Sequence, residues 1–151
     1  MRAMAVERGI TLEKLTELAK KDRAIDDEID KRTVELGNEE DRFVIDSRLG
    51  WHFLPHAVKI LLTVSEDEAA RRIFAARRPD EKENTTLERT KQNITARFAS
   101  EKERYTRLYG VDYADPKNHD FVLDTTPLTP AQIVDKLLMF LKEHGIVRRK
   151  L

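Results

Sequence analysis

The chain has 151 residues, enough for one domain with one hydrophobic core, and its 28 basic and 28 acidic residues give a formal net charge of +0. This balance argues against recruitment to nucleic acid or to a membrane surface by a global electrostatic field. The sequence has no cysteine and no apolar run near the roughly 20 residues of a membrane span, so disulfides and cysteine-ligated zinc are excluded and a cytoplasmic location is expected.

The part of the sequence before Gly37 favours helices. Apolar residues recur at helical spacing from Leu12, with Thr11 as a candidate N-cap, and again from Ile25, so the pattern predicts two helices before Gly37. Residues 42–46 (RFVID) then form a short apolar run typical of a buried strand. A loop or broken helix is expected after this run.

Residues 58–64 (VKILLTV) form a second apolar run and predict a second buried strand. Ser65 and Glu68 follow it with the spacing of a capping box, which predicts a helix directly after the strand. Residues 77–108 are strongly polar and rich in arginine, and they predict a broken and then long helix that faces solvent.

The last part of the chain repeats the order of strand and helix. Residues 120–124 (DFVLD) predict a third strand, and Thr129 and Pro130 have the residue types preferred at the cap and first position of a final helix. Strands separated by helices favour an α/β fold with a parallel sheet.

In parallel sheets ligands bind beyond the carboxyl ends of the strands, so the residues that follow each predicted strand are candidates for a site. Asp46, Ser47 and Arg48 follow the first strand, where a carboxylate could accept from magnesium-bound water and a guanidinium could grip a phosphate. An Asp46 that caps the next turn and pairs with Arg48 explains the same residues equally well.

Arg97 and Arg104 lie seven residues apart in the polar region, on one face of the predicted helix. Such a face could close over a polyphosphate. For an isolated run of charges, however, a solvated helix with Glu–Arg pairs is the favoured interpretation.

Four stretches occur in a familiar order: the opening R-x-M-A-x-E-x-G, then FVIDSRLGW, then SE-x-x-RY-x-x-x-YG-x-D, then VLDTTPLTPAQIV. Together they resemble the cytidylate kinase family, in the compact form typical of archaea and some bacteria, over essentially the whole chain. The resemblance implies the parallel-sheet P-loop NTPase fold of nucleoside monophosphate kinases. It also implies one domain over 1–151, with monophosphate-binding helices in 1–41 and an arginine-rich lid in 77–116.

The resemblance further implies a reaction. The family transfers the γ-phosphoryl of ATP to CMP or dCMP with Mg²⁺, so ATP and CMP or dCMP are the expected partners, and a monomer is expected when the enzyme is complete. Two alternatives stay open: an inactive nucleotide- or partner-binding module, and a kinase for another nucleoside monophosphate.

In the family a strand, a GxxGxGK[ST] loop and its helix precede the R-x-M-A segment, and that loop motif occurs nowhere in the 151 residues. We therefore expect Met1 to be an internal methionine of a longer kinase, and the chain alone to be inactive. The resemblance places the missing strand between the strands at 42–46 and 58–64, so exposed strand edges and poor solubility are expected.

The resemblance assigns acceptor roles to four residues. Arg2 matches the arginine that grips the monophosphate. Arg48 matches the arginine that contacts the acceptor phosphate or base. Asp30 and Arg32 fall in the nucleotide-binding helices near the acceptor.

It also assigns residues to the lid, the donor and the metal. Arg97 and Arg104 match lid arginines that reach the transferring phosphoryl, and Arg77 and Arg78 stand where the lid begins. The remaining matches are Thr125, Thr126 and Pro127, beside the donor adenine, and Asp46, with an indirect role near the magnesium shell.

Overall fold

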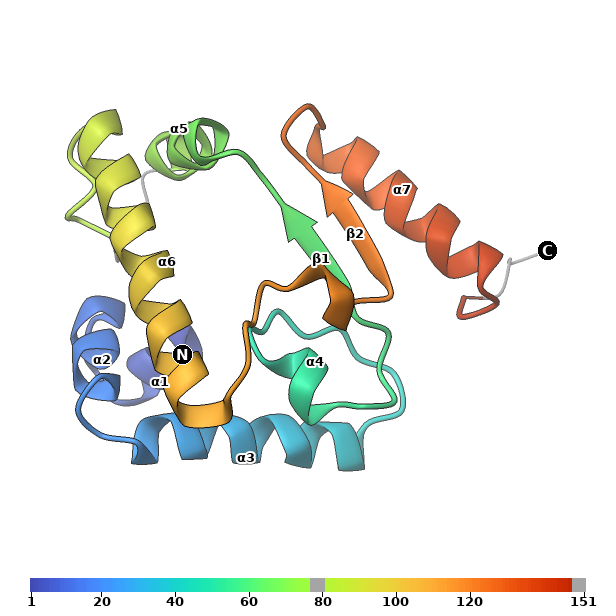
Figure 1. The fold of residues 1–151 in the computed structure, drawn as a ribbon, viewed down its shortest axis with the longest axis horizontal. Coiled ribbons are helices and arrows are strands. Elements are labelled where there is room, and N and C mark those ends of the chain that lie inside the picture. Colours follow the sequence, from blue (N-terminus) through green and yellow to red (C-terminus); the bar gives the residue numbers. More distant parts are fainter. Residues whose placement is uncertain (77–80, 148–151) are drawn as a thin grey trace.

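The computed structural model describes residues 1–76 and 81–147, which form a helix-rich α/β structure around a small parallel sheet (Figure 1). In chain order the elements are α1 (Arg2–Glu7), α2 (Leu12–Ala19), α3 (Ala24–Glu39), α4 (Gly50–Phe53), β1 (Ile60–Thr63), α5 (Glu66–Ala76), α6 (Leu87–Tyr109), a 3-10 turn (Pro116–Asn118), β2 (Phe121–Asp124) and α7 (Pro130–Glu143). Arg77 and Arg78 lie outside the described residues.

The sheet consists of β1 and β2, which pair in parallel with Ile60 opposite Phe121 and Thr63 opposite Asp124. This confirms the two strands predicted at 58–64 and 120–124 and their parallel arrangement. Helix α7 lies along β2 (Figure 1), and the rings of Phe121 and Phe140 stack at 4.4 Å between centroids.

The prediction of a buried strand at 42–46 is wrong. The backbone from Phe43 to Ser47 has no regular secondary structure, and Val44 is 100% exposed. A strand is stable only when a neighbour satisfies its N–H and C=O groups. Among the described residues the sheet has only β1 and β2, and neither pairs with this segment.

Helices α1, α2 and α3 share one core, made by Met4, Ala5, Leu15, Ala19 and Ile25. The sequence predicted two helices before Gly37, whereas three form and the third continues through Gly37 to Glu39. A Cβ atom at Gly37 would lie 2.3 Å from Leu54 Cδ2, so this glycine allows the segment after α4 to pack closely on α3 rather than ending the helix.

The long polar helix α6 faces solvent only in part, which corrects the expectation from its composition. Its C-terminal turns bury Arg104 and Tyr105, and Tyr105 forms a second core with Leu49 and Tyr113. Gly110, with φ of 70°, then ends the helix in the left-handed conformation that glycine adopts without strain. The C-terminal turns of α6 are therefore anchored in the protein interior, and the same helix carries the arginines farther along its length.

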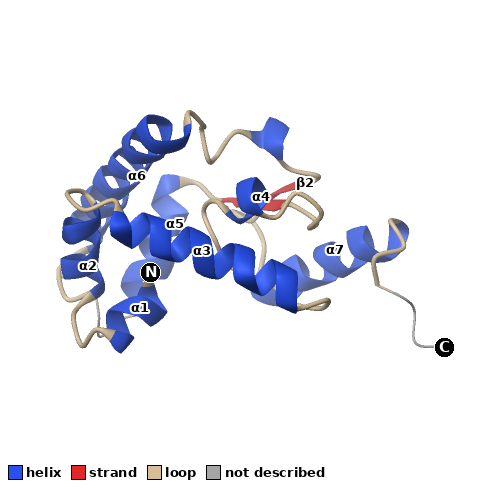
Figure 2. Cartoon of the chain, turned by 90° about the horizontal axis from the view of Figure 1, so that it is seen from below, coloured by secondary structure: helices blue, strands red, loops and turns tan. Residues whose placement is uncertain are grey.

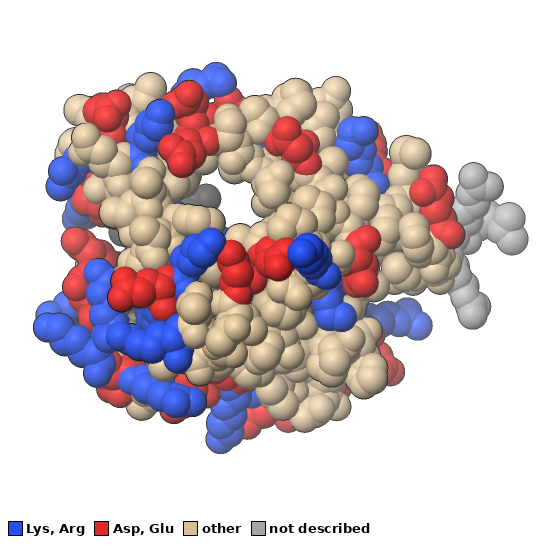
Figure 3. Space-filling model, viewed as in Figure 1, with Lys and Arg blue, Asp and Glu red and all other residues tan. Residues whose placement is uncertain are grey.

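The elements surround an opening that passes through the molecule between α6 and β1 (Figure 3). Helices α5 and α6 lie side by side on one flank of it. Helix α3 runs along the lower edge of the molecule in Figure 1, and seen from below it crosses the middle of the view with α4 beside it (Figure 2). Leu62 on β1 is 48% exposed and Val122 on β2 is 41% exposed, so the sheet is only partly covered.

None of the helices in the described ranges combines the length and the hydropathy needed to span a bilayer.

The N-terminus of α7 provides a direct test of the predicted cap. Thr129 Oγ1 accepts from the backbone N–H of Gln132, while the Gln132 side chain accepts from the backbone N–H of Thr129. We expect Thr129→Ala to lower the free energy of unfolding by about 1 kcal/mol in urea denaturation. Thr95→Ala, at an exposed position inside α6, should leave it unchanged or raise it slightly; equal losses in both variants would contradict the capping role.

Candidate functional site

Two adjoining pockets, of about 400 Å³ and about 500 Å³, lie between α1, α3, α6 and the segment 43–49. Both are lined by Met1, Asp46, Ser47, Arg48 and Tyr105, so they share a wall, and together they are called the cleft here. Volumes of this order are typical of small-molecule sites.

The first pocket, here called the apolar pocket, is walled by α3, α1 and the residues around α4. Its apolar lining residues are Ala3, Met4, Ile29, Leu36, Ile45, Leu49 and Phe53. Asp26, Asp30 and Arg32 add charge to the same wall from α3. A flat, largely apolar ring with a few polar groups on its edge suits such a lining.

The second pocket, here called the arginine pocket, collects guanidinium groups from distant parts of the chain. Arg2 comes from α1, Arg48 from the segment 43–49, and Arg97 and Arg104 from α6. Converging guanidinium groups are the protein's strongest means of binding a phosphate, because each offers a planar fork of donors.

A buried carboxylate orients two of these arginines. Glu81 has a side chain only 4% exposed, and its Oε1 lies 3.1 Å from Arg2 Nη2 and 3.7 Å from Arg97 Nη1. Asn84 donates a hydrogen bond to Glu81 Oε2 over 3.2 Å. The arginines of α1 and α6 are therefore held together before any phosphate arrives.

A second carboxylate holds Arg48. Arg48 Nε donates to Glu101 Oε2 over 3.0 Å, and the Tyr113 hydroxyl donates to the same oxygen over 3.4 Å. Arg48 thus extends from the segment 43–49 to α6 and stays half-exposed at the mouth of the cleft.

The third pair is buried. Arg104 Nε lies 3.7 Å from Asp26 Oδ2, and both side chains are at most 5% exposed. Arg104 Nη2 also donates to the Tyr105 hydroxyl. Burial raises the pKa of the Asp26 carboxyl above its usual value, while the nearby Arg104 opposes that rise.

Asp30 lies one turn along α3 from Asp26 and is less deeply buried. Burial raises its pKa, and a hydrogen bond donated by the Tyr109 hydroxyl to Asp30 Oδ2 opposes the rise. Arg32, which also lines the apolar pocket, pairs with Glu28 at 2.6 Å and with Glu7 at 2.8 Å. Of the three charged residues that α3 contributes to the apolar pocket, two are therefore acidic and one is basic.

The structure brings most of the predicted site residues into this cleft. They are Arg2, Asp30, Arg32, Asp46, Arg48, Arg97 and Arg104. Thr125, Thr126 and Pro127 line neither pocket and lie instead at the carboxyl end of β2.

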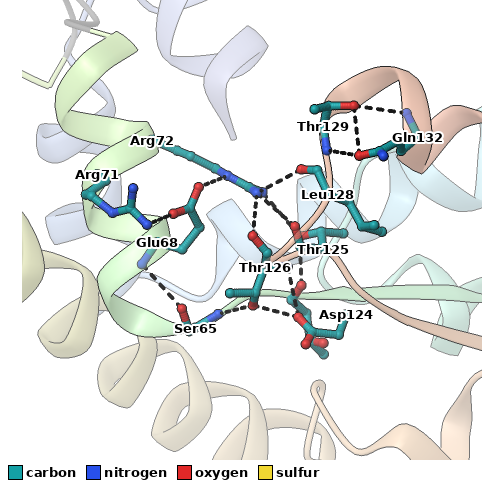
Figure 4. A network of polar contacts seen from close by, with 11 residues as sticks. Ser65, Glu68, Arg71, Arg72, Asp124, Thr125, Thr126, Leu128, Thr129 and Gln132 are labelled. Atoms are coloured by element: carbon teal, nitrogen blue, oxygen red, sulfur yellow. Dashed lines mark hydrogen bonds and ion pairs between the residues drawn. The ribbon is translucent and has the colours of Figure 1, made fainter.

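The loop at 125–128 is fixed by Arg72 of α5 (Figure 4). Arg72 Nη2 donates to the carbonyl oxygens of Thr125, Thr126 and Leu128 over 2.8 to 3.3 Å, while Arg72 Nε donates to Glu68 Oε1 over 2.7 Å. The loop is therefore braced against α5 by a cation that satisfies three carbonyl groups.

Sequence reasoning gave no role to the acids that orient the arginines. Helical spacing places Glu101 on the Arg97–Arg104 stripe of α6, but its partner Arg48 is 53 residues away in the sequence. Glu81 and Asp26 are far in sequence from the arginines they contact, so no local pattern connects them. Within the described residues, no three His, Asp or Glu side chains are grouped so that they could hold a metal ion.

Comparison with known proteins gives the family. A family model described as "Cytidylate kinase-like family" matches residues 1–127. The chain belongs to this family. It is 32% identical over 124 residues to a cytidylate kinase of Methanothermobacter thermautotrophicus and 36% identical over 130 residues to one of Pyrococcus furiosus, covering 73% and 64% of those proteins and 82% and 85% of itself.

A relative with a different name also matches. An S-adenosylmethionine-dependent nucleotide dehydratase of Lacinutrix mariniflava is 34% identical over 149 residues, which is 98% of this chain and 30% of that protein. The chain thus spans less than a third of this relative's length.

The brace at Arg72 predicts a large stability effect. Arg72→Ala removes hydrogen bonds from a charged donor to three buried or half-buried carbonyl groups, so we expect a loss of about 2 to 3 kcal/mol in the free energy of unfolding. The neighbouring Arg71 is exposed and pairs with Glu68, so Arg71→Ala should cost less than about 0.5 kcal/mol. Urea denaturation of both variants measures the difference; similar losses would show that the brace contributes nothing of its own.

Proposed function

We propose that the chain carries the acceptor-binding and lid parts of a cytidylate kinase, which transfers the γ-phosphoryl of ATP to CMP or dCMP. The observation that carries the proposal is the cleft itself. Four arginines from three separate segments converge on one pocket, and an apolar pocket of nucleobase character adjoins it. In this arrangement the acceptor phosphate lies among the arginines and the base lies against α3.

Phosphoryl transfer requires little from the protein beyond position and charge. The transition state is loose and its charge is spread over the equatorial oxygens, so guanidinium groups aimed at those oxygens supply much of the stabilisation. We propose that Arg97 and Arg104 serve the transferring group and that Arg2 and Arg48 hold the acceptor phosphate. Glu81 and Glu101 keep three of these groups oriented, which lowers the entropy lost on binding.

Asp46 fits an indirect magnesium role. It lies where the two pockets meet, and Mg²⁺ in kinases is commonly held by one or two carboxylates together with water and substrate phosphates. Bound with ATP, the ion would neutralise developing phosphate charge. Asp46 would accept a hydrogen bond from the water around it.

A kinase also needs a loop that binds the phosphates of ATP, and these residues do not supply one. No GxxGxGK[ST] motif occurs in the sequence. We propose that a strand and such a loop, from a segment outside these residues, pair with the open edge of β1. Within the described residues the edge of β1 away from β2 has no strand beside it, which supports this placement.

A nucleotide-binding module without transferase activity is the second candidate, and the same missing motif favours it. One measurement separates the two candidates. The chain is expressed together with the sequence encoded in frame before it, and the formation of CDP and ADP from CMP and ATP is measured. CDP formation supports the kinase. Acceptor binding without CDP formation supports the module.

The acceptor half can be tested on the chain as it stands. Arg48→Ala removes a half-exposed guanidinium from both pockets, so we expect CMP binding measured by calorimetry to weaken by on the order of tenfold to a hundredfold. Arg42→Ala, at an exposed position outside both pockets, should bind like the wild type. Unchanged binding in the Arg48 variant would remove Arg48 from the acceptor site.

The lid half needs the active kinase. Arg97→Ala should lower kcat by on the order of a hundredfold with little change in CMP affinity, because the group acts on charge that develops in the transition state. Arg97 is a better choice than Arg104, whose removal would leave Asp26 buried without its counter-charge. Arg107→Ala, exposed on the same helix, is the matched control and should keep the wild-type kcat.

A further inference from the structure

Two different groups hold the side chain of Arg48 in one orientation. Arg48 Nε donates to Glu101 Oε2 over 3.0 Å, and the guanidinium lies over the ring of Tyr113, with 5.8 Å between Arg48 Cζ and the ring centroid. A cation over the face of an aromatic ring at this separation is attracted by the negative charge of that face. The carboxylate and the ring therefore restrict the arginine from two sides.

Tyr113 takes part in both of these restraints. Its ring lies against the guanidinium, and its hydroxyl donates over 3.4 Å to Glu101 Oε2, the same oxygen that accepts from Arg48. Burial, together with the nearby Glu101 carboxylate, raises the pKa of the Tyr113 hydroxyl, so the hydroxyl stays protonated and remains a donor at neutral pH. Tyr113 thus contacts Arg48 directly and also restrains the carboxylate that holds Arg48.

Tyr113 is itself fixed in the interior of the protein. It is only 6% exposed and packs with Leu49 and Tyr105 in the second core. The rings of Tyr105 and Tyr113 meet edge to face, with 5.4 Å between their centroids. Because packing locks the rotamer of a buried side chain, Tyr113 can hold an arginine that would otherwise sample many rotamers.

These restraints leave the phosphate-binding part of Arg48 available. In the described part of the chain, the hydrogen bond and the ion pair of Arg48 use its Nε atom alone. Its two terminal nitrogens carry donors that can grip a phosphate with two parallel hydrogen bonds. The Arg48 side chain lines both pockets and is 52% exposed, so a ligand in the cleft can reach these donors.

We propose that Tyr113 is a positioning residue for the acceptor's phosphate, which acts by holding the Arg48 guanidinium with its two terminal nitrogens free. The assignment rests on the proposed function, because it takes Arg48 to hold the phosphate of a nucleoside monophosphate. A flexible arginine loses rotamer freedom when it binds a phosphate, whereas a restrained arginine loses less. Tyr113 lines neither pocket, so it raises the affinity for the acceptor without touching it.

The test is a double-mutant cycle on the 151-residue chain, with the dissociation constant for CMP measured by NMR titration, which also resolves weak binding. Tyr113→Leu keeps an apolar side chain in the core but removes the ring face and the hydroxyl, so we expect CMP binding to weaken by on the order of tenfold. Because Tyr113 acts through Arg48, the same substitution in the Arg48→Ala background should change the dissociation constant by less than about twofold.

Two further variants separate the orientation of Arg48 from general damage to the core. Tyr113→Phe keeps the ring face and the packing but loses the hydroxyl, so its affinity for CMP should lie between those of the wild type and Tyr113→Leu. It carries the same cycle with Arg48→Ala if the leucine variant does not fold. Phe98→Leu is the matched control: Phe98 contacts the Tyr113 ring at 5.6 Å between centroids and is 48% exposed, and its loss should leave the CMP dissociation constant within about twofold of the wild type.

The outcomes separate this assignment from the proposed function. A loss of CMP affinity in the Tyr113 variants that disappears in the Arg48→Ala background supports it. Wild-type affinity in the folded Tyr113 variants overturns it, as does an equal loss with and without Arg48 or an equal loss in Phe98→Leu, and in these cases the acceptor site itself stands. No binding of CMP to the wild type overturns the proposed acceptor site and this assignment together.

Discussion

The burial of Arg104 and Tyr105 at the end of α6 is the contact on which the rest of the cleft depends. Tyr105 packs with Leu49 and Tyr113, and Arg104 faces Asp26 of α3. Because α6 is one continuous helix, this anchorage also fixes the direction of its arginine-bearing face. Removing either buried partner would leave an uncompensated charge or a cavity, which are among the costliest defects in a protein interior.

The arginines of the cleft are paired with acids, and this explains how a neutral chain can hold an anion site. Glu81 and Glu101 engage Arg2, Arg97 and Arg48. The carboxylates of these pairs are largely buried, but the arginine side chains are 35% to 52% exposed, so a doubly charged phosphate can reach the same guanidinium groups. The acids therefore orient the site in the absence of ligand without closing it, and the net charge of the molecule stays near zero.

The sequence was sufficient where the determining interactions are local. The strands at 60–63 and 121–124 and the cap at Thr129 follow from residues within a few positions of one another. Sequence-based prediction failed where contacts with residues far away in the sequence determine the local structure. The run at 42–46 has the composition of a buried strand but has no described neighbour to pair with. Gly37 lies inside a helix, where the absence of a side chain leaves room for Leu54. The family motifs located the arginines of the cleft, whereas the pairing of each arginine with its acid became visible only in three dimensions.

Helix α6 links the two halves of the proposed reaction. Its central residue Arg97 lies in the arginine pocket and its last turns contact α3, which forms the wall of the apolar pocket. An acceptor that fills both pockets would contact the wall against which Arg104 anchors the helix and also the arginine farther along it. Binding of such an acceptor would thereby favour the orientation of the arginine that serves the transferring phosphoryl. Recognition of the acceptor and acceleration of the transfer would then depend on one element, helix α6, so an acceptor that fits the cleft poorly would be disfavoured in both steps.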